Sequence, residues 1–106
     1  MKKEIIYDYN ARKELAEFDE EVREDFAASI EMLEREGRLE FPDARKITGD
    51  IFEIRVMHEG VYRGFYAYIK HPGIVILHFF QKKSQETPLK NIRTALNRLR
   101  NYQFYE

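Results

Sequence analysis

Charged side chains that suit phosphate binding gather in the second half of the chain. They are Glu53, Arg55, Arg63, His78, Lys82 and Lys83. RNA carries its own nucleophile, the 2′-hydroxyl group, so a protein that cleaves RNA needs a proton acceptor, a proton donor and cations around the scissile phosphate. One preorganised donor aimed at developing negative charge contributes roughly 3–4 kcal/mol, and general acid–base transfer adds about 10²–10⁴ in rate. The set therefore suits metal-free cleavage of a phosphodiester.

These residues follow a pattern of three consecutive β-strands. Runs rich in Ile, Val, Phe and Tyr are interrupted at residues 58–60 and 71–73, where Gly and Pro favour turns. Successive strand residues point to opposite faces of a sheet, so Glu53 and Arg55 share one face. The other face of that strand carries Phe52, Ile54 and Val56. We expect the apolar face to lie on a core and the charged residues to lie on an open face, with His78 among them if the register allows.

The first part of the chain is predicted to support this sheet. We expect a short strand at residues 3–9, a short helix capped by Asn10, and a longer helix that begins after Asp19 and ends at Gly37. Apolar residues at helical spacing give the longer helix a stripe that can pack on the sheet. Residues 38–48 are expected to form a connecting segment, because a proline interrupts them.

A last helix is predicted to complete the domain. Thr87 suits the N-cap position and Pro88 the first helical position. The buried stripe of this helix is expected to contain Leu89, Ile92, Leu96, Leu99 and Tyr102. The predicted order is β-α-α-β-β-β-α, an α+β domain whose antiparallel sheet is packed by an N-terminal helical hairpin and a C-terminal helix. Residues 1–106 are expected to form a single domain.

Composition narrows the class of protein. Hydrophobic residues make up 43% of the chain and charged residues 35%, enough for both a core and a solvated surface. There is no cysteine, and no pattern typical of a signal peptide or a membrane span, so we expect a cytoplasmic protein. The net charge of −1 is divided unequally, since residues 1–44 carry 7 Lys/Arg against 14 Asp/Glu and residues 45–106 carry 11 against 5. The basic second half suits a polyanionic partner.

Other common chemistries fit the sequence less well. Zinc needs closely spaced His or Cys ligands, whereas His58, His71 and His78 fall in or beside separate turns and strands. No glycine-rich phosphate loop or dinucleotide fingerprint is present. A Ser-His-acid triad stays open, although Ser29 is placed in a helix and Ser84 lacks a sharp strand-to-helix turn. We predict neither a metal nor a cofactor.

Three motifs, in order, give the chain a resemblance to a known family. They are FEIR at 52–55, YRGFY at 62–66 and IVILHFFQKKSQETP at 74–88. This series resembles the RelE/ParE toxin superfamily, and within it the HigB-like, phage-related branch. The resemblance extends over nearly the whole chain and implies a RelE-like, microbial ribonuclease-type fold.

The same resemblance implies a function and partners. It implies the toxin of a type II toxin–antitoxin system, a ribosome-dependent mRNA endonuclease that works without metal through attack of the 2′-hydroxyl group. The partners it implies are the ribosome, mRNA and a HigA-like antitoxin with a helix-turn-helix domain. DNA would be bound only through the complex with the antitoxin.

The resemblance also implies roles for individual residues. Arg55 matches the basic residue of the first motif, Arg63 the arginine of the second, and Lys82 and Lys83 the basic pair of the third. These four are expected to bind RNA and to stabilise the transition state. Glu53 stands at a position that is basic in the RelE branch, so it is either a proton acceptor or an ion-pair partner that orients Arg55.

Two further kinds of side chain are candidates for proton transfer. His78 could act as an acid or a base, or it could be a core histidine with satisfied hydrogen bonds. The RelE branch has a tyrosine shortly after the basic pair, which this chain lacks. Tyr102 or Tyr105 could replace it, but a tyrosine titrates near pKa ~10 and would need activation.

The assignments have structural alternatives. Arg55 and Arg63 could form sheet-face ion pairs with Glu53 and Glu59, and the lysine pair could protect an edge strand from aggregation. A second function also stays open, a non-nucleolytic protein-binding toxin such as a ParE-like gyrase poison, or an inactive prophage remnant of the same fold. The basic residues favour the nuclease, whereas the weak net acidity of the chain counts against it.

Overall fold

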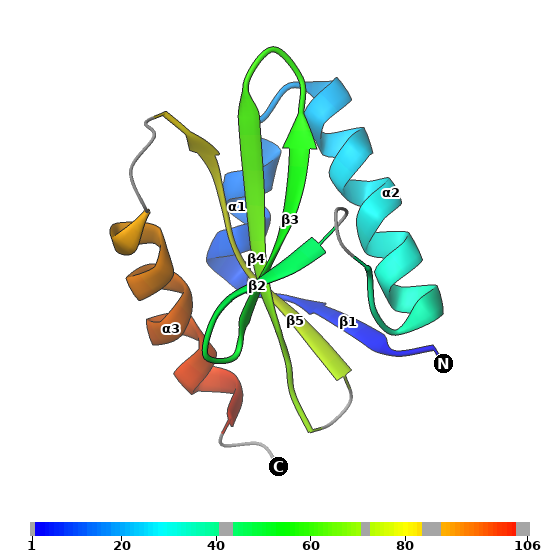
Figure 1. Ribbon diagram of the computed structural model, residues 1–106, viewed down its shortest axis with the longest axis vertical. Helices are drawn as coiled ribbons and strands as arrows, with labels where there is room; N and C mark the ends of the chain where they lie inside the picture. The colour runs from blue at the N-terminus through cyan, green and yellow to red at the C-terminus, as the bar shows by residue number, and fades with distance from the viewer. Residues whose placement is uncertain (1, 41–43, 71–72, 84–87, 104–106) are drawn as a thin grey trace.

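The computed structural model describes residues 2–40, 44–70, 73–83 and 88–103. In chain order the elements are β1 (Glu4–Tyr7), α1 (Tyr9–Ala16), α2 (Glu20–Glu36), β2 (Ala44–Thr48), β3 (Ile51–Met57), β4 (Val61–Tyr68), β5 (Gly73–Lys82) and α3 (Leu89–Gln103) (Figure 1). The predicted α+β class is confirmed. The predicted turn at 71–73 lies largely outside the described residues.

The five strands form one mixed sheet in the order β1-β5-β4-β3-β2. β1 runs parallel to β5, with Tyr7 opposite Ile76, while the other neighbours are antiparallel. The prediction of a purely antiparallel sheet is therefore wrong. No turn joins β1 to β5, so the local sequence contains no signal for their relative direction.

The strand β2 lies in the segment that we expected to be a connection. Its sequence ARKIT places two cations side by side, so it lacks the alternation typical of a half-buried strand. Pairing with β3 holds it in place, with Arg45 opposite Glu53 and Thr48 opposite Ile51. Gly49 makes the tight turn between them with a φ of 50°. Tertiary pairing, which the sequence pattern does not reveal, makes this segment a strand.

The helix boundaries show which capping predictions hold. α2 begins after Asp19 and ends at Gly37, whose φ of 84° is the left-handed conformation expected of a C-terminal glycine. α1 is capped by Asp8 and not by Asn10, because the Asp8 carboxylate accepts hydrogen bonds from the backbone N–H groups of Asn10 and Ala11. Within the described ranges, no helix is long and apolar enough to span a membrane.

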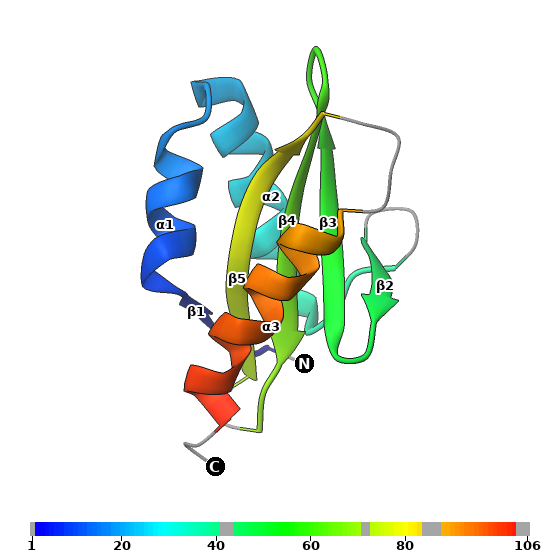
Figure 2. The same ribbon diagram turned by 90° about the vertical axis from the view of Figure 1, so that its left-hand side faces the viewer.

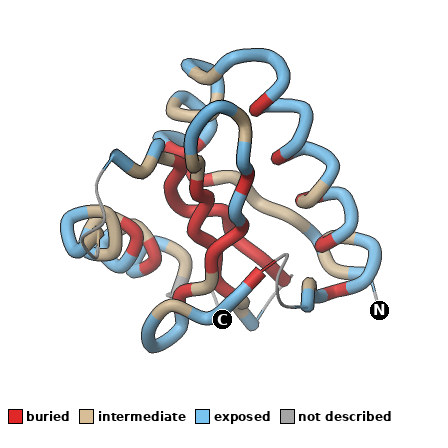
Figure 3. Tube along the Cα trace, turned by 45° about the horizontal axis from the view of Figure 1, so that its top comes forward, coloured by how far each residue is buried: buried red, intermediate tan, exposed pale blue. Residues whose placement is uncertain are grey.

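Helices cover both faces of the sheet (Figure 2). On one face α1 and α2 enclose a core that includes Phe26, Leu33, Ile54, Tyr66 and Phe79. On the other face α3 packs on Ile51, Phe65, Ala67, Val75 and Leu77. Figure 3 shows the buried positions concentrated in the strands between these layers. The β3–β4 hairpin extends past the end of α3 in Figure 2, so α3 covers only part of its face.

The buried stripe of α3 differs from the predicted one. Leu89 and Leu96 are 62% and 40% exposed. The side chains that pack on the sheet are Ile92, Ala95, Leu99 and Tyr102. Their spacing of three, four and three residues keeps one face of the helix on the sheet. The predicted cap, Thr87, lies outside the described residues.

Gly64 on β4 lies close against two aromatic rings of the core. A Cβ atom at this position would lie 2.9 Å from Phe79 Cε1 and 3.3 Å from Phe26 Cε1. We predict that Gly64→Ala lowers the free energy of unfolding by about 1–3 kcal/mol, because the rings must shift. Urea denaturation measures this. Gly49→Asn is the control, since its Cβ would meet open space and Asn tolerates positive φ. A Gly64→Ala variant as stable as the wild type would contradict the packing.

Candidate functional site

The buried carboxylate of Glu53 on β3 is surrounded by three arginines, one each from β2, β3 and β4. Arg45 Nε lies 2.5 Å from Glu53 Oε2, and Arg63 Nε lies 3.0 Å from Glu53 Oε1. Arg55 Nη2 is 3.7 Å from Oε2. We call these four residues the arginine cluster. The strand register builds it, because Arg45 lies opposite Glu53 on one side of β3 and Arg63 lies opposite Arg55 on the other.

The cluster has a buried base and an exposed rim. The side chains of Glu53 and Arg63 are 1% and 5% exposed, whereas those of Arg45 and Arg55 are 45% and 40% exposed. The pKa of Arg63 is lowered from its usual value, chiefly because the side chain is buried. The opposite charge of Glu53 raises this pKa, whereas the neighbouring cations Arg55 and Arg45 lower it. Three guanidinium groups around one carboxylate leave an excess of positive charge that faces solvent through the two exposed arginines.

The Arg63–Glu53 contact is an ion pair without a hydrogen bond. Arg63 Nε and Glu53 Oε1 are both buried, and neither makes a hydrogen bond of suitable angle with any described residue. Charge therefore holds this pair, and the hydrogen-bonding capacity of both atoms is left unused within the described chain.

The structure corrects the expected position of Glu53. We expected it on an open, solvated face, but it is buried at the base of the arginine cluster. A carboxylate between three guanidinium groups fits the predicted ion-pair role. Glu59, the other predicted acidic partner, lies instead 3.8 Å from His58 at the β3–β4 turn.

Arg45 is a site residue that the sequence did not reveal. It lies on β2, the strand missed by pattern, and no motif of the resemblance contains it. The sequence shows Arg45 only as the first residue of an Arg-Lys pair in a segment of strand length. Its role becomes visible once β2 is paired with β3, because this pairing places Arg45 opposite Glu53.

Lys82 ends β5 beside the cluster, and Lys83 follows it directly. Lys82 lies opposite Val61, two positions along from the Arg63–Phe80 pair, so it is on the same face as Arg63. Lys82 is partly exposed and Lys83 is exposed. Neither forms an ion pair with a residue in the described ranges, which leaves both cations available for an anionic partner.

His78 is on the same face but has different partners. Its Nδ1 lies 2.9 Å from Glu14 Oε1 and its Nε2 lies 2.7 Å from Asn91 Oδ1. The side chain is only 10% exposed. Both ring nitrogens therefore bind α1 and α3, and neither contacts the arginine cluster.

A partly buried polar network extends from this histidine. Arg98 donates hydrogen bonds to both Glu14 carboxylate oxygens and to Leu77 O. Glu14 also accepts a hydrogen bond from Phe79 N. β1 pairs with β5 only as far as Ile76, so these side chains satisfy backbone groups of β5 beyond the end of β1.

Tyr102 belongs to the same network. Its hydroxyl donates a 2.8 Å hydrogen bond to Asp8 Oδ1. Burial and this bond raise the pKa of Tyr102 to about 12, so it stays protonated at neutral pH. Tyr102 thus joins α3 to the N-cap of α1. Tyr105, the other tyrosine considered, lies outside the described residues.

The network predicts an acid-dependent loss of stability. Burial alone would raise the pKa of Glu14, but hydrogen bonds from His78, Arg98 and Phe79 N lower it to about 2 from 4.5. The stability contributed by the Glu14 carboxylate is thus present above about pH 4.5 and is lost as the pH falls toward about 2. We predict that Glu14→Gln is less stable than the wild type at neutral pH, and that the difference shrinks across this window.

Urea denaturation at several pH values measures that difference. Glu17→Gln is the matched control, because Glu17 is an exposed residue next to the end of the same helix. A stability difference between the wild type and Glu14→Gln that stays constant from neutral pH to about pH 3 would contradict the prediction.

The arginine cluster predicts a large effect of neutralising its carboxylate. Glu53→Gln should lower the free energy of unfolding by about 3–5 kcal/mol, because the guanidinium groups would lose their buried countercharge. Added inorganic phosphate should stabilise this variant more than the wild type, since an anion can replace the lost charge. Glu59→Gln, whose parent side chain is 90% exposed, is the control. Unchanged stability of Glu53→Gln would contradict the prediction.

Comparison with solved structures supports the predicted RelE-like fold. A double arginine-to-alanine mutant of the E. coli toxin RelE, in the free state, superposes with a TM-score of 0.73. The two sequences are 20% identical, and the match covers 93% of this chain and 99% of that chain. At this identity the likeness establishes the fold, and the HigB-like branch stays a prediction.

No curated protein gives a significant match to this chain. A comparison with models of protein families identifies the family. The family model "Phage derived protein Gp49-like (DUF891)" matches residues 13–100, from α1 through most of α3. The matched region contains the whole arginine cluster and the lysine pair. The chain therefore belongs to the phage-derived Gp49-like family.

Proposed function

We propose that this protein is the toxin of a type II toxin–antitoxin system, of the HigB-like branch, and that it cleaves mRNA on the ribosome without a metal ion. The observation that carries the proposal is the convergence of Arg45, Arg55 and Arg63 on one buried carboxylate. The cluster lies on β2, β3 and β4 of a RelE-like sheet. Family membership supports the same reading.

The cluster suits stabilisation of a phosphorane-like transition state. The 2′-oxygen attacks the phosphorus atom, the bond to the 5′-oxygen breaks, and a 2′,3′-cyclic phosphate and a 5′-hydroxyl result. Arg55 and Arg45 are exposed enough to reach the phosphate, while Arg63 is held in the base of the cluster. Lys82 and Lys83 bind neighbouring phosphates.

Glu53 acts in this proposal by positioning the arginines. Without its countercharge the three guanidinium groups would repel one another, so it keeps the cations preorganised before substrate binds. Glu53 and His78 remain the predicted acid–base candidates, and each is engaged with protein partners in the free chain.

The proposed function names the partners and the compartment. The ribosome and its mRNA are the target, which places the protein in the cytoplasm. A HigA-like antitoxin with a helix-turn-helix domain would neutralise it, and DNA would be bound through that complex. Lys82, Lys83 and the two exposed arginines supply the charge for binding an RNA surface.

The test compares a cluster variant with a matched basic variant. Arg55→Ala removes an exposed cation of the cluster, and Arg93→Ala removes an exposed cation of α3 that lies outside it. We predict that Arg55→Ala lowers mRNA cleavage by about 10²–10³-fold, the loss expected for one transition-state donor. Arg93→Ala should cleave like the wild type. Each protein is expressed in a bacterial host, and new mRNA 5′ ends are mapped in translated frames.

The outcomes separate the possible functions. New ends inside translated messages that disappear with Arg55→Ala would support a ribosome-linked nuclease. Equal cleavage by the wild type and Arg55→Ala would overturn the role of the cluster. Growth arrest without new ends would instead indicate a protein target, and DNA gyrase would be tested next. Arg63→Ala should also abolish arrest while antitoxin binding persists, provided that its folding is verified.

A further inference from the structure

An aromatic ring that the proposed chemistry does not use lies beside the arginine cluster. Phe80 on β5 is directly opposite Arg63 on β4. Alternation along β5 places His78, Phe80 and Lys82 on the same face, so the ring lies between a buried histidine and an available cation. Phe80 is partly exposed, whereas Phe65 on the same face is fully buried.

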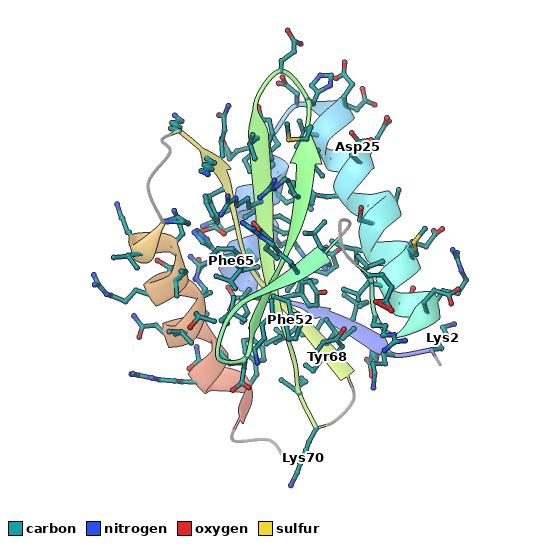
Figure 4. The ribbon with its side chains drawn as sticks, in the orientation of Figure 1. Lys2, Asp25, Phe52, Phe65, Tyr68 and Lys70 are labelled. Carbon is teal, nitrogen blue, oxygen red and sulfur yellow. The ribbon has the colours of Figure 1, made fainter. Side chains whose placement is uncertain are left out.

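The ring is fixed from two directions. It stacks on His78 with a centroid distance of 5.3 Å and an interplanar angle of 20°. It meets Phe65, labelled in Figure 4, edge to face at 5.0 Å. Glu14 and Asn91 hold both nitrogens of the His78 ring. The polar network therefore supports a two-ring stack between the core under α3 and the arginine cluster.

Part of the Phe80 ring is accessible to a ligand. The ring packs against the core under α3, yet the residue is only partly buried. His78, two residues before it, stacks on the ring, and Lys82, two residues after it, lies on the same face of β5. A planar group stacked on the exposed part of the ring would lie next to cations on both β4 and β5.

We propose that the exposed part of the Phe80 ring stacks on an unpaired nucleobase of single-stranded RNA while the adjacent phosphate binds the arginine cluster. This inference rests on the proposed function and deepens it. Aromatic side chains beside cationic grooves bind single-stranded nucleic acids in this way, since every base has a π-face. Stacking tolerates any base, so Phe80 selects unpaired nucleotides and contributes affinity without reading the sequence.

The experiment uses two short RNAs that differ at one nucleotide. One carries 2-aminopurine, whose fluorescence is quenched by stacking, and the other is abasic at that position, with binding of both measured by competition at low salt. The wild type should bind the base-containing RNA roughly 5- to 100-fold more tightly than the abasic RNA, the range expected from one stacked base. Phe80→Leu keeps the apolar contacts with the core and should bind the two RNAs nearly equally. Phe80→Tyr keeps the π-face and should retain the preference.

Two comparisons keep this inference separate from the proposed function. Arg55→Ala should weaken binding of both RNAs by a similar factor, because it removes a phosphate contact and leaves the ring. A base preference and quenching that survive in Phe80→Leu would overturn the stacking role, even if Arg55→Ala weakens binding. Unchanged binding of both RNAs by Arg55→Ala would overturn the phosphate site instead. Absence of binding by the wild type would overturn both. Thermal unfolding of Phe80→Leu and Phe80→Tyr verifies that each variant is folded.

Discussion

The charge balance around Glu53 constrains the whole site. An isolated buried carboxylate is strongly unfavourable, and three adjacent guanidinium groups repel one another. The negative carboxylate and the positive guanidinium groups are therefore stable here only because they neutralise each other. The interaction needs side chains from β2, β3 and β4 in one register. It therefore couples the assembly of the sheet to the assembly of the cations that would meet a phosphate.

A second constraint is the edge of β5 beyond the end of β1. The backbone N–H of Phe79 and the carbonyl of Leu77 find their partners in Glu14 and Arg98, not in another strand. Because one side chain comes from α1 and the other from α3, satisfying this edge also fixes both helices. Unpaired edges favour aggregation, so closing this one protects the fold.

The two constraints meet at the stack of His78 and Phe80. The network immobilises His78, the histidine supports the ring, and the ring lies opposite Arg63 of the cluster. Membership of the Gp49-like family and the RelE-like fold place this arrangement on a scaffold that occurs in at least one toxin. Fold alone does not define chemistry, so the functional argument depends on these side chains.

The sequence by itself determined the elements whose signals are local. Alternation in β3 identified Glu53 and Arg55 as residues of one face, and the glycine after α2 marked the end of that helix, because both depend on neighbours within a few positions. Only the tertiary structure decided the direction of β1, the existence of β2, and hence the place of Arg45. The burial of Glu53 and the capture of His78 were likewise decided by residues distant in the chain. A periodic pattern records which side of a strand a residue occupies, whereas its partners depend on long-range pairing that no short stretch encodes.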